Sequence, residues 1–299
     1  MKRDQPSSTA QLIARGIVFV AHDKRWKHLV WPRAAGLSAG FLQAASRRAR
    51  LLLRLLRCPW FRALVWRVES LALPGILLHY AARKRYLEDA ARQALQDGIQ
   101  QIVVLGAGFD TLAWRLHDEC EVVFIEADHA ATQRIKRRCQ SLAFPRLHFL
   151  EIDFSRQSLA KRLEDCPHYS PAHRTLFIAE GLLMYLKPSQ VADMFEEVAA
   201  PHNRFAFTFM EIQRDGRPNF RHCNALVGLW LRWRGEPFRW GLRRDELAPF
   251  LQARGWELRE TADAEVLRRR YLQGQKPLAE GERIAIADCL PPKPGCEYH

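Results

Sequence analysis

Cysteine is scarce in this chain of 299 residues, and its spacing shows no pattern. No C-x-x-C pair occurs, so we expect neither a disulfide framework nor a zinc ribbon, and no metal site. No apolar run reaches roughly eighteen residues without an arginine, so no membrane-spanning helix is predicted. The opening MKRDQPSSTA lacks an apolar core and a cleavage site, so we expect a cytoplasmic protein. The seven cysteines are Cys58, Cys120, Cys139, Cys166, Cys223, Cys289 and Cys296.

Acidic residues are outnumbered by basic ones. The chain has 46 Lys and Arg against 33 Asp and Glu, a formal net charge of +13. This balance suits an anionic substrate, a phospholipid surface or a nucleic acid, and selects none of them. The length and the 48% hydrophobic content fit one α/β domain with additions, and the sequence indicates no oligomeric state.

Short apolar runs alternate with amphipathic stretches after Pro74. Helical periodicity is clearest over 129–142 and 188–199, between such runs. Strand and helix repeating at this spacing predict an α/β fold with a parallel sheet covered on both faces. The predicted strands are 101–105, 121–125, 147–152, 175–179 and 205–210, with 256–261 and 282–288 as two further candidates.

The stretch QIVVLGAGFDTLAWRL, from Gln101 to Leu116, ends an apolar strand in Gly106-Ala107-Gly108. Glycine lets the backbone bend sharply and approach a ligand, although a plain structural turn would use the same residues. We expect Asp110 or Thr111 to cap the following helix. Thr111 stands where a dinucleotide fingerprint has its third glycine, so a pyrophosphate is not predicted.

Two acidic residues follow at the end of the next apolar run, VVFIEADHA. Glu126 and Asp128 stand roughly 20 residues beyond the glycines, where a carboxylate accepts hydrogen bonds from ribose hydroxyls. A cofactor with a ribose and without a pyrophosphate fits both features, and S-adenosylmethionine is such a molecule. The alternative is a solvated strand end with no ligand.

Four motifs in order, QIVVLGAGFDTLAWRL, VFIEADHA, FLEIDF and TLFIAEGLLMYL, resemble the leucine carboxyl methyltransferase family. The resemblance covers about Pro74 to Met210. It implies a Rossmann-like class I methyltransferase fold, with a seven-stranded, mostly parallel sheet, one antiparallel strand and an N-terminal helical cap. We assign residues 1–73 to a basic, Trp-rich cap and 74–299 to the methyltransferase domain, with a substrate-pocket insertion at 212–242. The family's Asp-Pro element is missing between Asp23 and Leu73.

The resemblance also implies roles for residues in these motifs. Asp128 would hold the ribose, with Glu126 in reserve, and Asp153 and Phe154 would meet the adenine. Gly106 would lie near the methionyl group, within a cofactor-binding turn made of Gly106, Ala107, Gly108 and Asp110.

The methionyl end of the cofactor requires charges of both signs. Glu180 resembles the family's partner for the methionyl ammonium. The helix ahead of the glycine strand offers Arg83 and Arg85 for the carboxylate, and Arg83 fits the family spacing better. A lone arginine on a helix is otherwise a solvated residue. Tyr185 would line the transfer site as the catalytic candidate.

These features predict an S-adenosylmethionine-dependent O-methyltransferase acting on a carboxyl or hydroxyl group of a small apolar or aromatic acceptor. A carboxylate needs no general base, whereas a hydroxyl does. His79 and Tyr185 are conceivable bases, although a lone histidine is more often structural. A protein C-terminal carboxylate and a modified tRNA base are alternative acceptors. Five aromatic residues after the fifth predicted strand could line an acceptor pocket or pack in the core: Phe220, Trp230, Trp233, Phe238 and Trp240.

The segment FLQAASRRARLLLRLLRCPWFRALVWRV places Arg47, Arg50, Arg54 and Arg57 on one helical face, and Pro59 ends that helix. We favour a cap helix with its arginines in water. Peripheral contact with an anionic membrane is the alternative, and nucleic acid is a weaker one. Two rival functions of other classes remain open: a non-catalytic basic module that binds membranes or RNA, and a nicotinamide-dependent oxidoreductase.

Overall fold

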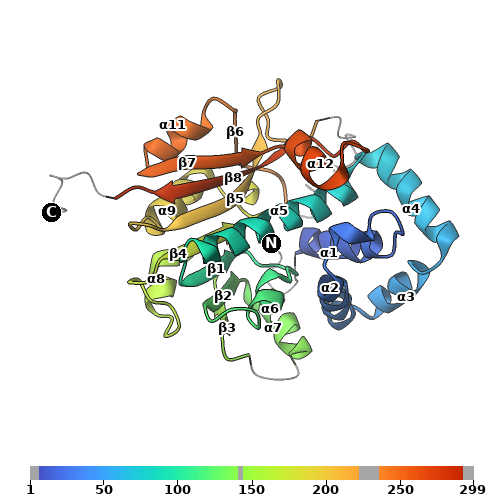
Figure 1. Ribbon diagram of the computed structural model, residues 1–299, viewed down its shortest axis with the longest axis horizontal. Helices are drawn as coiled ribbons and strands as arrows, with labels where there is room; N and C mark the ends of the chain where they lie inside the picture. The colour runs from blue at the N-terminus through green and yellow to red at the C-terminus, as the bar shows by residue number, and fades with distance from the viewer. Residues whose placement is uncertain (1–6, 141–143, 222–235, 292–299) are drawn as a thin grey trace.

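The computed structural model describes residues 7–140, 144–221 and 236–291. A central sheet has the strand order β3-β2-β1-β4-β5-β8-β7 (Figure 1). Neighbours along this path pair in parallel except β8, which is antiparallel to β5 and β7. This confirms the predicted seven-stranded, mostly parallel sheet. The strands are β1 (Gln101–Leu105), β2 (Val123–Asp128), β3 (Leu147–Glu151), β4 (Thr175–Ala179), β5 (Arg204–Glu211), β7 (Trp256–Ala262) and β8 (Glu282–Cys289), while β6 (Gly241–Leu242) pairs with β5 alone.

Alternate side chains of β1 enter two separate apolar cores. Ile102 and Val104 face one core, and Val103 and Leu105 face the other, because successive side chains of a strand point to opposite faces. Helices cover both cores, as a buried parallel sheet requires. The first core takes side chains from α1 (Ser8–Ala21), α2 (Pro32–Ala45), α3 (Arg47–Leu55), α5 (Ile76–Gln96), α6 (Leu112–Leu116), α7 (Ala130–Cys139) and α12 (Ala264–Leu272); the second takes them from α8 (Leu159–Glu164), α9 (Pro188–Glu197) and α11 (Leu247–Gln252).

One predicted strand is misplaced by the sequence pattern. We expected it over 121–125, whereas β2 spans Val123–Asp128. The strand extends because Glu126 pairs with Val104 of β1 and Asp128 with Glu151 of β3. Both acidic residues therefore belong to the strand itself. The helix predicted over 129–142 is α7, Ala130–Cys139, whose first turn is capped by the side chain of His129.

The helices of the N-terminal segment begin and end at recognisable residues. We expected Pro59 to end the helix that carries Arg47 to Arg57, whereas α3 ends at Leu55, before Arg57, and Pro59 begins α4 (Pro59–Ala72). Gly75 adopts φ +80° just before α5, and a Cβ there would lie 2.5 Å from the carbonyl oxygen of Pro277. Only glycine fits this close approach. In Figure 1, α3 and α4 (blue to cyan) project at one end of the molecule, away from the sheet.

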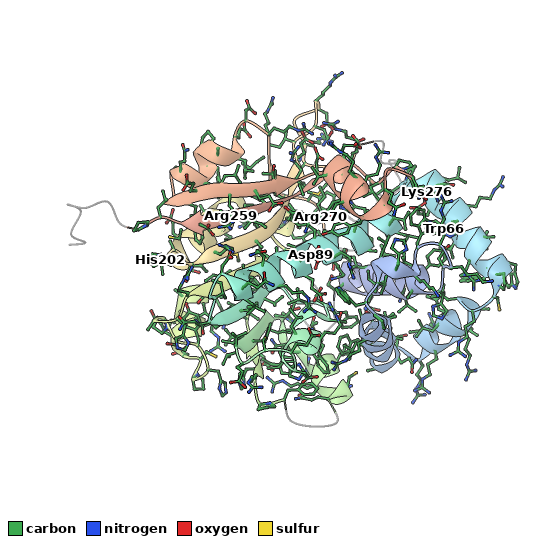
Figure 2. The ribbon with its side chains drawn as sticks, viewed as in Figure 1. Trp66, Asp89, His202, Arg259, Arg270 and Lys276 are labelled. Atoms are coloured by element: carbon green, nitrogen blue, oxygen red, sulfur yellow. The ribbon has the colours of Figure 1, made fainter. Side chains whose placement is uncertain are left out.

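Residues of α4 and α5 contact α12 and the segment that follows it (Figure 2). Asp89 of α5 accepts a hydrogen bond from the hydroxyl of Tyr271 (2.6 Å) and one from Arg270 (3.2 Å), both on α12. The ammonium of Lys276 lies 4.3 Å from the ring centroid of Trp66 on α4. Of these contacts, the one between Lys276 and Trp66 crosses the division that we placed at Leu73.

Substitution of Phe195 tests the core beneath α9. Its side chain is fully buried, with its ring centroid 4.8 Å from that of Phe205 and 5.1 Å from that of Phe207. We expect Phe195→Ala to lower the free energy of unfolding by about 3–5 kcal/mol in urea denaturation followed by circular dichroism. Leu71→Ala is the control, because Leu71 is 73% exposed and should lose less than about 0.5 kcal/mol. Equal losses would contradict the assignment of the core.

Candidate functional site

The candidate site lies at the edge of the sheet where the parallel strands end. Strands β1, β2 and β4 deliver Gly106, Asp128 and Glu180 to this edge, and antiparallel β8 begins there with Glu282. Gly106 and Gly108 adopt φ +61° and +50°, which few other residues tolerate. A Cβ on Gly106 would lie 2.9 Å from Leu182, and one on Gly108 would lie 3.1 Å from Ala10 of α1. The turn is therefore tightly enclosed.

Hydrogen bonds fasten the glycine turn to its surroundings. The Gly108 N–H donates to the carboxylate of Asp128, and the His129 N–H donates to its other oxygen. Burial raises the pKa of Asp128, and these two bonds oppose that effect. The Asp110 N–H donates to the Ala107 carbonyl (2.8 Å), which closes the turn. The carboxylate of Asp128 thus faces the turn, where the predicted ribose would lie.

Glu126 occupies a different position from Asp128, although both are in β2. Its side chain is 1% exposed and pairs with Lys136 of α7 at 2.6 Å. Burial raises the pKa of Glu126 to about 7, against the opposing charge of Lys136. Lys136 also donates to the Asp110 carbonyl (2.8 Å). Glu126 is therefore engaged in holding the turn, which leaves Asp128 as the ribose candidate.

Arg83 of α5 is buried between two carboxylates. It donates to Glu180 from Nε (2.9 Å) and Nη2 (2.7 Å), and Nη1 lies 2.7 Å from both oxygens of Glu282. Burial lowers the pKa of Arg83, but Glu282 and Glu180 outweigh it and keep the guanidinium charged. Arg85 instead places its guanidinium 4.1 Å from the ring centroid of Trp31. Of the two predicted arginines, the structure brings Arg83 to the sheet edge.

Lys84, which the sequence analysis did not single out, joins Asp110 to Glu180. Its ammonium contacts Asp110 and lies 2.9 Å from Glu180. Burial raises the pKa of Asp110, but the charge of Lys84 outweighs it, so this pKa lies below its usual range. Of the two predicted capping residues, Thr111 is the N-cap of α6, although its side chain makes no capping hydrogen bond. Asp110 accepts a hydrogen bond from the Leu112 N–H, at the first residue of the helix.

Asp153 and Phe154 follow β3, beside the end of β2. The Ile152 N–H donates to the Asp128 carbonyl (3.0 Å), which brings this segment to the same edge. Asp153 accepts from the N–H of Ser155 (3.0 Å) and its side chain is 38% exposed. Phe154 is half-buried against the second core. The pair predicted for the adenine therefore lies next to the ribose candidate.

Tyr185, in the short helix η2 (Leu183–Tyr185), belongs to an aromatic cluster. Its ring centroid lies 5.7 Å from that of Phe238, which is 6.1 Å from that of Phe220. Burial raises the pKa of Tyr185 above its usual range, although a hydrogen bond with Thr9 opposes this. The phenol therefore stays protonated at neutral pH. Trp240 is buried elsewhere, against Phe209 and Phe250, and Trp230 and Trp233 lie outside the described residues.

His79 forms a buried pair that no sequence signal revealed. Its Nε2 lies 3.0 Å from Glu282, a residue 203 positions away in the chain, and each side chain is 1% exposed. Glu282 also borders a cavity of about 260 Å³ beyond β5, whose lining mixes charges of both signs. Within the described ranges, no group of three His, Cys, Asp or Glu residues is arranged to hold a metal ion.

Sequence comparison matches this chain to methyltransferases. The sequence profile of the leucine carboxyl methyltransferase family matches residues 43–199. A Mycobacterium tuberculosis protein, provisionally named an S-adenosyl-L-methionine-dependent methyltransferase, is 27% identical over 75% of this chain. The match spans 64% of that relative, less than two thirds of its length. A Frankia alni protein with the same provisional name is 30% identical over 59% of this chain and 61% of its own.

A solved structure shares the fold along the whole chain. A crystal structure from Thermobifida fusca, provisionally titled a methyltransferase, aligns over 97% of both chains with a TM-score of 0.56. The sequence identity is 13%. This likeness concerns the architecture alone and extends to the N-terminal helices.

The buried carboxylate of Glu282 makes stability depend on pH. Burial raises its pKa, but Arg83 and His79 outweigh burial and hold it at about 2, below the ordinary 4.5. The stabilisation is complete above the unfolded pKa and is lost as pH falls toward the folded one. We expect Glu282→Gln to be less stable at pH 7, and to lack about 2 kcal/mol of the decline that the wild type shows between pH 5 and pH 3.

Urea denaturation at these pH values measures the difference. The control is Glu280→Gln, because the side chain of Glu280 is 54% exposed and its replacement should change the stability little. A Glu282→Gln variant that declines as steeply as the wild type would show that this carboxylate is not stabilised by its partners.

Proposed function

The chain belongs to the leucine carboxyl methyltransferase family, and on this premise we propose that it is an S-adenosylmethionine-dependent O-methyltransferase. Its acceptor would be a carboxyl or hydroxyl group of a small apolar or aromatic molecule. The observation that carries the proposal is the meeting of the glycine turn, Asp128, and the Glu180 and Lys84 pair at one sheet edge. Ligands of open α/β sheets bind at this edge.

The charges at this edge are complementary to the cofactor. The carboxylate of Asp128 would accept hydrogen bonds from the ribose hydroxyls, beside Asp153 and Phe154 for the adenine. Glu180 would receive the methionyl ammonium, and Lys84 or Arg83 the methionyl carboxylate. Lys84 bridges Asp110 and Glu180. When the cofactor binds, its methionyl ammonium would replace the Lys84 ammonium at Glu180, and its methionyl carboxylate would replace the Asp110 carboxylate as a partner of Lys84.

The protein would promote methyl transfer by orienting the acceptor and the cofactor in a pocket that excludes water. The bound cofactor supplies a methyl group on a sulfonium sulfur, which an oxygen nucleophile attacks in line. Ala10 of helix α1 packs against Gly108, and Thr9 of the same helix is hydrogen-bonded to Tyr185. Tyr185, as a protonated phenol, would donate a hydrogen bond that orients the acceptor. The aromatic cluster beside it favours an apolar or aromatic acceptor.

Substitutions in β2 distinguish the two acidic residues. We expect Asp128→Asn to weaken the binding of S-adenosylhomocysteine roughly 5- to 150-fold. The amide keeps one acceptor oxygen, so one of the two ribose hydroxyls loses its partner at a cost of about 1–3 kcal/mol. Isothermal titration calorimetry measures the affinity. Glu126→Gln is the matched control, because the amide oxygen can still accept a hydrogen bond from Lys136 and so keep the turn in place; its affinity should change less than about threefold. Equal weakening in both variants would mean that the ribose lies elsewhere.

The nature of the acceptor can be read from the labelled product. We expect tritium from S-adenosyl-[methyl-³H]methionine, incubated with the protein and a cell extract, to appear in an organic-soluble small molecule. Label in precipitated protein as a base-labile ester would indicate a C-terminal carboxylate, and label in the RNA fraction would indicate tRNA. Either result would contradict the proposed acceptor class.

The surface of α3 and α4 supports a second proposal, contact of a cytoplasmic protein with an anionic membrane. Residues 43–73 contain seven arginines and one acidic residue. α4 has no buried residue, and one of its faces exposes Trp60, Leu64, Val68 and Leu71. An apolar stripe bordered by arginines suits a peripheral helix on anionic lipid, and like charges oppose pairing with a second copy. No helix among the described residues is long and apolar enough to span a bilayer.

Sedimentation with vesicles tests this surface. We expect the protein to pellet with vesicles containing phosphatidylglycerol and to stay in solution with pure phosphatidylcholine. The double variant Trp60→Ser/Leu64→Ser should pellet at least several-fold less, because it removes apolar contact and keeps every arginine. A wild-type protein that stays in the supernatant with both kinds of vesicle would end the proposal.

A further inference from the structure

The pair formed by His79 and Glu282 fixes which imidazole nitrogen carries the proton. Glu282 is held ionised by Arg83, whose Nη1 lies 2.7 Å from both of its oxygens. An ionised carboxylate can only accept hydrogen bonds. The Nε2 of His79, 3.0 Å away, must therefore be the N–H donor. In the neutral ring this leaves Nδ1 as an unprotonated nitrogen with a lone pair.

Nδ1 of His79 is buried and has no hydrogen-bond partner among residues 7–140, 144–221 and 236–291. A buried polar atom without a partner destabilises the folded state, so native proteins rarely leave one without a use. The other side of the ring is tied firmly, since Glu282 is shared with Arg83 and both carboxylate oxygens are engaged. The histidine therefore has the geometry of a base positioned by a carboxylate.

The ring of His79 borders the aromatic cluster of Tyr185, Phe220 and Phe238. Its centroid lies 6.2 Å from that of Phe220, with the ring planes at 87°. Met184 and Met210 complete the apolar surroundings of this cluster. A ligand that reaches His79 through this cluster would be apolar or aromatic around its reacting group.

Three of the acidic or phenolic groups near this cluster are not free to accept a proton. Tyr185 has a raised pKa and stays protonated. Glu180 is shared by Arg83 and Lys84. Glu236 accepts hydrogen bonds from the backbone N–H groups of Ser8 and Thr9 (both 3.1 Å). Nδ1 of His79 is thus the group with a lone pair to spare among these side chains.

We propose that His79, positioned by Glu282, is the general base of the reaction, and that the acceptor is a hydroxyl on an aromatic or apolar molecule. The inference rests on the proposed methyltransferase function and chooses between its two acceptor groups, since a carboxylate would need no base. In the methyl-transfer step the acceptor oxygen bonds to the methyl carbon, and the bond from that carbon to sulfur breaks with both electrons left on sulfur. The hydroxyl proton moves to Nδ1, and the resulting imidazolium is stabilised by Glu282.

The variant His79→Gln tests the base with phenols of different acidity. A glutamine amide can still donate to Glu282 but offers no basic nitrogen. With labelled S-adenosylmethionine at pH 8, we expect the variant to methylate 4-methylphenol about 10²- to 10⁴-fold more slowly than the wild type. With 4-nitrophenol, which is already largely ionised at that pH, the loss should be less than about tenfold. Equal losses with the two phenols, or none with either, would overturn the proposal, as would methylation of benzoate but not of phenols.

Two further measurements separate this proposal from the proposed function. Calorimetry should give the variant an affinity for S-adenosylhomocysteine within about threefold of the wild type, which shows that it is folded. Wild-type protein that does not bind S-adenosylhomocysteine would refute the methyltransferase assignment itself. In wild-type protein labelled with ¹⁵N-histidine and free of cofactor, NMR should show His79 protonated at Nε2 and not at Nδ1, with 4-methylphenol shifting the Nδ1 resonance. The opposite tautomer, or no shift, would overturn the role of His79 whatever the turnover.

Discussion

A buried guanidinium between two carboxylates organises the site. Arg83 joins Glu180, which follows β4, to Glu282, which begins β8. A buried charge is tolerated only when it is paired, so α5 and these two strands must meet in this one arrangement. Two consequences follow from the pairing. Glu180 keeps one oxygen for Lys84 at the sheet edge, and Glu282 stays ionised and fixes the tautomer of His79.

The same edge combines a rigid part with an exchangeable part. The glycine turn is held by backbone donation to Asp128 and by Lys136, which ties it to Glu126. The contacts of Lys84 with Asp110 and Glu180, in contrast, are partly exposed, with 20% of the lysine side chain accessible. A preformed turn beside replaceable ion pairs suits a ligand that carries a nucleoside at one end and a zwitterion at the other.

Local patterns predicted the features that depend on local sequence. The bounds of β1 and β4 match because buried parallel strands are short apolar runs between turn residues. The end of β2 was wrong, since pairing with β1 and β3 carries the strand through two acidic residues. Glu282, Lys84 and the place of Trp240 could not be predicted, because each depends on contacts between residues distant in the chain. The family resemblance supplied Arg83, while periodicity alone could not separate it from Arg85.

We infer that a nucleoside with an amino-acid tail binds where β1, β2 and β4 end. Hydrogen–deuterium exchange with and without S-adenosylhomocysteine locates the bound ligand. Exchange should become slower in the peptides that contain Gly106–Asp110, Asp128 and Glu180, and stay the same in those of α3 and α4. Protection confined to α3 and α4, or absent throughout while the ligand is bound, would refute this binding site.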